Sequence, residues 1–101
     1  MKEETMFKLP KDIISDSPSY LRFFKKGDEI IPVNITQVFH SARKPGQIVH
    51  TREGLLVILG TWFPYEHGPI LVVYDYVTRE IKTYENTANV PDGKVIGRIK
   101  L

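Results

Sequence analysis

Leu55-Leu56-Val57-Ile58-Leu59-Gly60-Thr61-Trp62-Phe63 includes the most apolar stretch of the chain. A second run of the same kind, residues 70–76, follows it after a connection that contains proline and glycine. β-Branched and aromatic residues in short runs, separated by turn-forming residues, are typical of strands. Runs of this type predict strands at residues 29–39, 47–51, 55–63, 70–76, 80–84 and 94–100.

The links between the predicted strands are short. Arg52-Glu53-Gly54 and Val77-Thr78-Arg79 fit hairpin connections, and Lys44-Pro45-Gly46 and Pro91-Asp92-Gly93 fit tight turns. Pro32 indicates a bend or an edge position in its strand. Consecutive strands are therefore expected to be antiparallel neighbours. The fold class predicted is mainly β, with about six strands in a strongly bent antiparallel sheet or a small half-closed barrel.

Residues 17–27 carry the signals of a helix instead. Ser17 suits the N-cap and Pro18 the first helical position, and Gly27 can adopt the left-handed conformation that ends a helix. Lys25 and Lys26 suit the negative end of the helix dipole. We therefore predict one short N-terminal helix, preceded by a flexible arm at residues 1–12.

The composition is that of one small globular domain. The chain has 101 residues, of which 42% are hydrophobic and 26% charged, enough for a single core. It has no cysteine, which excludes a disulfide framework and a thiolate metal site. No apolar run is long enough to span a bilayer, so we expect a cytoplasmic protein.

Charge and motif content argue against several classes of function. The chain has 14 basic and 12 acidic residues, a balance too even to favour a dedicated nucleic-acid binder. The three histidines, His40, His50 and His67, lack metal-ligand spacing, and no glycine-rich phosphate loop is present. We expect neither a metal nor a cofactor.

The order of the motifs from Ser17 to Leu101 carries a family resemblance. Ser19 opens the predicted helix and is followed by Gly27-Asp28 and an apolar strand; two further Gly-led strands follow, at residues 44–49 and 93–99. This order resembles the LexA/signal-peptidase superfamily of serine-lysine peptidases. The resemblance implies a β scaffold, Ser19 in the place of the nucleophile, and self-association through edge and C-terminal strands.

One of the two residues that this chemistry needs, the lysine, is missing from its expected place. A serine nucleophile is inert until a neutral, desolvated amine takes its proton, and the family's lysine follows its second Gly-led strand. Here that place holds residues 54–60, Gly-Leu-Leu-Val-Ile-Leu-Gly, with no ionisable group. Lys82 is the nearest later candidate for the base. Tyr20 and Arg22 also replace the methionine and proline of the family pattern.

The leading hypothesis is therefore a non-catalytic protein-binding or self-association module, with residues 94–101 as the dimer strand. The alternative is a serine-lysine peptidase or self-cleaving regulator with Ser19 as nucleophile and Lys82 as base. An isolated domain of this kind, with no helix-turn-helix region, also suggests a phage or another mobile element as its source.

The connection after the strand at residues 55–63 is the second candidate site. It contains Trp62, Phe63, Tyr65 and His67 around proline and glycine. Loops carried on rigid sheets often form binding surfaces, and Trp and Tyr are common anchors of interfaces. We expect one of Trp62 and Phe63 to lie in the core, and Tyr65 and His67 to be exposed.

Arg43 and Lys44 lie at a predicted turn and could join these aromatic residues. A basic and aromatic surface on a small β-barrel suits single-stranded nucleic acid, which gives a third hypothesis. Acidic residues are interleaved with these basic residues. We therefore favour the interpretation that the charged side chains at the turns are simply exposed to solvent.

Overall fold

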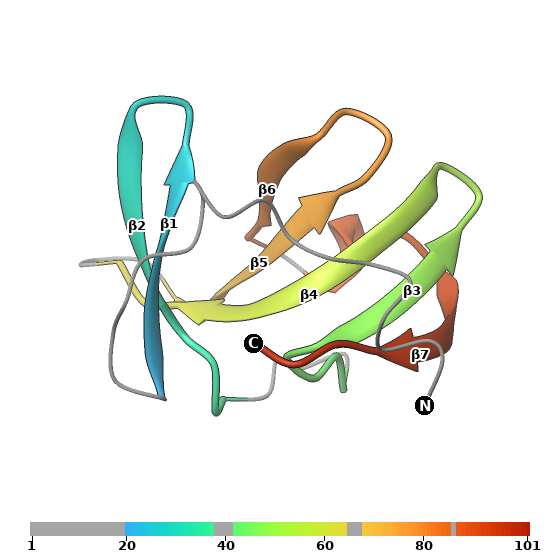
Figure 1. Ribbon diagram of the computed structural model, residues 1–101, viewed down its shortest axis with the longest axis horizontal. Coiled ribbons are helices and arrows are strands. Elements are labelled where there is room, and N and C mark those ends of the chain that lie inside the picture. Colours follow the sequence, from blue (N-terminus) through green and yellow to red (C-terminus); the bar gives the residue numbers. More distant parts are fainter. Residues whose placement is uncertain (1–19, 38–41, 65–67, 86) are drawn as a thin grey trace.

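The computed structural model describes residues 20–37, 42–64, 68–85 and 87–101. In this part of the chain seven strands form one antiparallel sheet (Figure 1). The strands are β1 (Leu21–Lys26), β2 (Glu29–Asn34), β3 (Gln47–Thr51), β4 (Gly54–Trp62), β5 (Ile70–Asp75), β6 (Glu80–Tyr84) and β7 (Gly93–Arg98). A short 3-10 turn, η2 (Thr87–Asn89), precedes β7. The prediction of a mainly β, antiparallel fold is confirmed.

The long strand β4 is the centre of the sheet. β5 pairs with it from Leu56↔Asp75 to Trp62↔Ile70. On its other side, the first half of β4 pairs with β3 and its end meets β2 at Asn34↔Thr61. β1, β6 and β7 lie outside β2, β5 and β3 respectively. In Figure 1, β4 therefore runs between the upright β1–β2 hairpin and the β3–β7 pair.

Residues 21–26 form strand β1, so the prediction of a helix over residues 17–27 is wrong for this part; residues 17–19 lie outside the described ranges. β1 pairs with β2 along its whole length, and the buried side chains of Phe24 and Ile31 lie opposite each other. Gly27, predicted to end the helix, instead opens the two-residue Gly27-Asp28 hairpin turn, with a φ of 63°. A left-handed glycine in the first position of such a turn matches the twist of paired strands. Pairing and burial outweigh helix signals that are only local, because a helix this short is marginally stable alone.

The other strands agree with the prediction to within one or two residues, except at the end of β2. Asn34 ends β2 because its side-chain oxygen accepts bonds from the amide and the hydroxyl of Thr36, at 2.9 and 2.7 Å. Such local bonds favour a turn over a strand. Pro32 lies opposite Phe23 in the part of β2 that pairs with β1 alone. β2 lies between β1 and β4 in the sheet and is therefore not an edge strand, but in the described part of the chain Pro32 itself has a paired neighbour only on β1.

Both faces of the central strands are buried. Alternate residues of β4 and β5 enter an inner and an outer cluster, as the two-residue period of a strand requires. The inner cluster consists of Phe24, Ile31, Val33, Ile48, Val57, Leu59, Val72, Tyr74, Ile81 and Ile99. The outer cluster consists of Val49, Leu56, Ile58, Leu71 and Val73, with Tyr84 and Val90 packed against it. Burial on both sides explains why β4 and β5 are mostly apolar on both of their faces.

The sheet stays open between β1 and β6. No ladder joins these two strands in the described part of the chain. Phe24 of β1 and Ile81 of β6 belong to the same buried cluster, and Lys26 Nζ donates a hydrogen bond to Thr83 Oγ1 at 3.0 Å. The structure has one open antiparallel sheet of seven strands, where about six strands in a strongly bent sheet or a half-closed barrel were predicted.

Candidate protein-binding edge

β7 forms an edge of the sheet that carries exposed apolar side chains. Among the described strands it pairs with β3 alone, so the other side of its backbone has no neighbouring strand there. Val95 and Ile96 are 40% and 43% exposed. An unpaired strand edge offers amides and carbonyls to which a strand of another chain can be added. This edge is the clearest candidate for a binding surface.

A bulge sets the conformation of β7. Thr51 lies opposite Gly93 and Val49 opposite Val95, but Ile48 then lies opposite Gly97. Ile96 is therefore an extra residue on β7, and such a bulge bends and twists its strand. The sequence shows two adjacent apolar residues at this point, but the bulge itself depends on the register of β7 against β3.

The end of β7 is anchored to the rest of the domain. The amide of Ile99 donates a hydrogen bond to the carbonyl of Gly46 at 2.7 Å. The side chain of Ile99 is buried in the inner cluster. The edge is thus held in place at its C-terminal end, while the side chains of Val95 and Ile96 remain partly exposed.

The edge is basic. Lys94, Arg98 and Lys100 are exposed on or directly after β7, and Asp92 is the one acidic side chain within residues 92–101. None of the four takes part in an ion pair with another described residue. A strand added to this edge would therefore place its side chains beside three cations.

The structure places Trp62 and Phe63 at the end of β4. Trp62 is half-buried against the inner cluster, and Phe63 is 53% exposed. Trp62 thus packs against the core without belonging to it, so the prediction of one core residue in this pair is met only in part. Tyr65 and His67 lie outside the described residues, so their exposure stays a prediction.

Arg43 and Lys44 lead into β3. The amide of Lys44 donates to the side-chain oxygen of Gln47 at 3.0 Å, and the amide of Gln47 donates to the carbonyl of Lys44 at 3.2 Å. The side chain of Lys44 is exposed and that of Arg43 partly so. Within the described ranges no hydrogen bond or ion pair joins these two side chains to Trp62. A joint aromatic and basic surface stays a prediction.

Lys82 is the partner of a buried carboxylate. Its Nζ lies 2.9 Å from Oδ2 of Asp75, whose side chain is almost wholly buried. The hydrogen bond to Asp75 raises the pKa of Lys82. A lysine that acts as a general base needs the opposite shift, because only the neutral amine accepts a proton. Ser19 lies outside the described residues, so its role as a nucleophile stays a prediction.

Asp75 makes stability dependent on pH. Burial would raise its pKa, but hydrogen bonds from Lys82, Val77 and Thr78 outweigh burial and hold the pKa below its ordinary value. A carboxyl group with a lowered folded pKa stabilises the fold above its unfolded pKa, and this stabilisation is lost as the pH falls through the folded pKa. Urea unfolding between pH 7 and pH 2 is expected to show a loss of stability below about pH 4 that is smaller in Asp75→Asn. An identical loss in wild type and variant would exclude Asp75 as its source.

Comparison of the chain with models of known families, with curated proteins and with solved structures gave no match. The resemblance to the LexA/signal-peptidase superfamily therefore stays a prediction. Among the described residues, no three His, Cys, Asp or Glu side chains gather where they could hold a metal ion. No helix in those same ranges has the length and apolar character needed to cross a bilayer.

Proposed function

We propose that this domain is a non-catalytic protein-binding module that takes up an extended segment of another protein as a further strand beside β7. The observation that carries the proposal is the edge of β7 that no other described strand covers, with Val95 and Ile96 exposed between Lys94 and Arg98. In strand addition, main-chain hydrogen bonds provide affinity, and pockets or charges for alternate side chains provide specificity. The proposal rests on this edge alone and is independent of any kinship with serine-lysine peptidases.

The charge of the edge favours an acidic partner over a second copy of the domain. Symmetrical antiparallel pairing of two β7 strands about Ile96 would place Lys94 of each copy opposite Arg98 of the other. Like charges directly opposite each other destabilise a strand pair, whereas opposite charges contribute about 0.2–1 kcal/mol each. A segment that alternates acidic and β-branched residues would satisfy both the cations and the two exposed apolar side chains.

Titration of the ¹⁵N-labelled protein with a blocked hexapeptide of alternating glutamate and valine tests this proposal by NMR. We expect saturable shifts at the amides of residues 93–98. The double variant Lys94→Glu/Arg98→Glu should weaken binding about tenfold or more, because two favourable charge pairs become repulsive. Both side chains are exposed, so the variant is expected to fold.

Lys44→Glu/Arg52→Glu is the matched control, since it makes the same change in charge at exposed turns beside β3. Its affinity for the peptide should equal that of the wild type. Equal weakening in both double variants, or shifts confined to other strands, would contradict binding at β7. Light scattering provides a second check: a concentration-dependent dimer that Ile96→Lys abolishes would show that the edge accepts a second copy, against the acidic partner proposed here.

A further inference from the structure

A basic cleft lies between the tips of the β1–β2 and β5–β6 hairpins. Both tips stand at the same end of the molecule, well separated from β7 (Figure 1). The cleft has a volume of about 570 Å³, and Lys25, Lys26, Arg79 and Glu80 line it. The volume falls within the range of about 300–1,000 Å³ that is usual for small-molecule sites.

The charges of the cleft are mostly available for a ligand. Lys26 donates one hydrogen bond to Thr83 and keeps further donors, since an ammonium group has three. Within the described ranges, neither Lys25 nor Arg79 forms an ion pair or a side-chain hydrogen bond. Glu80 is the one carboxylate among the lining residues, which leaves the cleft with an excess of positive charge.

The conformation of Arg79 is costly for an arginine. Its φ is 61°, in the left-handed region that turns usually fill with glycine or asparagine. The turn is nevertheless fixed, because the amide of Arg79 donates to the carbonyl of Asp75 at 2.7 Å and the Asp75 side chain accepts the amides of Val77 and Thr78. An arginine in a position where glycine would relieve the strain points to a use for its guanidinium group.

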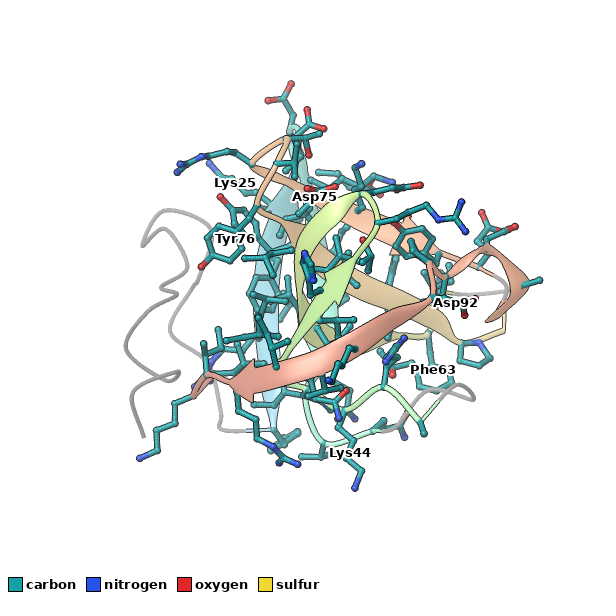
Figure 2. The ribbon with its side chains drawn as sticks, turned by 90° about the vertical axis from the view of Figure 1, so that its right-hand side faces the viewer. Lys25, Lys44, Phe63, Asp75, Tyr76 and Asp92 are labelled. Carbon is teal, nitrogen blue, oxygen red and sulfur yellow. The ribbon has the colours of Figure 1, made fainter. Side chains whose placement is uncertain are left out.

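The floor of the cleft is apolar and rigid. It is formed by the buried side chains of Tyr74 and Ile81. The ring of Tyr74 packs edge-on against Tyr76, with 5.0 Å between the ring centroids. In Figure 2, Lys25, Asp75 and Tyr76 lie at one end of the molecule and Lys44 at the opposite end.

We infer that this cleft binds a small molecule that carries a phosphate group on a compact apolar body. Arg79 is the main anchor, because a planar guanidinium group binds two phosphate oxygens at once, while Lys25 and Lys26 supply the remaining charge. The apolar body of the ligand lies toward Tyr74 and Ile81. The carboxylate of Glu80 disfavours long polyanions, so nucleic acid is not the ligand proposed for this cleft.

Titration with phenyl phosphate at pH 8 and constant ionic strength tests this inference. The phosphate group is then a dianion, and saturable shifts are expected at the amides of residues 25–27 and 79–81. Arg79→Gln should weaken binding about tenfold or more, since a charge-assisted pair of hydrogen bonds is lost. Benzoate, with a similar ring but a single negative charge, should bind at least about tenfold more weakly than phenyl phosphate.

Two further variants separate binding from folding. Arg79→Gly relieves the positive φ, so it should raise the unfolding temperature while binding is lost. Lys44→Gln/Lys100→Gln removes two exposed cations elsewhere and should leave the affinity unchanged. The inference is overturned if phenyl phosphate does not saturate the protein, or if Arg79→Gly binds it as tightly as the wild type does. It is also overturned if Lys44→Gln/Lys100→Gln lowers the affinity as much as Arg79→Gln does.

Discussion

Replacing Asp75 by alanine is expected to lower the free energy of unfolding by about 3 kcal/mol, because a buried carboxylate with several hydrogen bonds is removed. Oδ1 accepts the amides of Val77 and Thr78 at 2.8 and 3.2 Å, and Oδ2 lies 2.9 Å from Nζ of Lys82. Alanine leaves these three donors without their acceptor. Urea unfolding at pH 7, followed by the fluorescence of Trp62, measures the change.

Two further variants test whether the loss of stability in Asp75→Ala comes from the lost hydrogen bonds. Asp75→Asn keeps one acceptor oxygen and should lose about half as much stability as Asp75→Ala. Asp92→Ala removes an exposed carboxylate and should stay within about 0.5 kcal/mol of the wild type. If Asp75→Ala proved as stable as Asp92→Ala, the hydrogen bonds around Asp75 would not stabilise the fold.

The position of Asp75 also connects stability with the proposed cleft. The side chain of Asp75 fixes the turn that holds Arg79 in its left-handed conformation. A looser turn between β5 and β6 should leave the conformation of β7 unchanged, because β7 lies on the other side of β4. Asp75→Ala is therefore expected to weaken the binding of phenyl phosphate and to leave the binding of the acidic peptide at β7 unchanged.

The central strands could be predicted because burial on both faces leaves a simple pattern. β4 and β5 are mostly apolar, and the short links from β3 to β4 and from β5 to β6 indicated antiparallel neighbours for both strands. The pairing of Asp75 with Lys82 did not follow from the predicted turn, because a connection at residues 77–79 would set Tyr76 opposite Glu80. The observed connection has four residues, 76–79, and sets Asp75 opposite Glu80 and Val73 opposite Lys82. This register puts Asp75 and Lys82 on the same face as diagonal neighbours.

The N-terminal element could not be settled by its local signals. Ser17, Pro18 and Gly27 favour a helix, but Gly27-Asp28 between two apolar runs is equally a hairpin signal. What decides between them is the partner strand, since Phe24 is buried only when β1 lies against β2. Tertiary pairing of this kind is not visible in an eleven-residue window.

The candidate sites were harder to predict than the strands. The C-terminal strand was expected as an interaction edge, but only from a family resemblance, and the bulge at Ile96 depends on its register with β3. The cleft brings Lys25 and Lys26 to Arg79 and Glu80 from hairpins more than fifty positions apart in the sequence. Their meeting depends on how the sheet curves between β1 and β6, which no spacing in the sequence encodes.

Gly60→Ala is expected to destabilise the domain by about 3 kcal/mol or more, through backbone strain and overpacking together. Gly60 has a φ of 148° and lies at the register shift of β4, beside the point where β2 meets this strand. A Cβ there would lie 2.5 Å from the carbonyl oxygen of Asn34 and 2.7 Å from Cγ1 of Val33. The backbone of β2 would have to move away from β4.

The damage should be confined at first to the β1–β2 hairpin, because Asn34↔Thr61 is its one point of pairing with the rest of the described sheet. Hydrogen exchange is expected to show lost protection in β1 and β2 before β3 and β5. Gly68→Ala is the matched control, since a Cβ there meets no atom within 4 Å. This variant should change stability by less than about 0.5 kcal/mol.

Displacing the hairpin also removes Lys25 and Lys26 from the cleft, so phenyl phosphate binding should fall while the peptide still binds β7. Equal loss of both activities at temperatures where the protein remains folded would mean that the two surfaces are not independent.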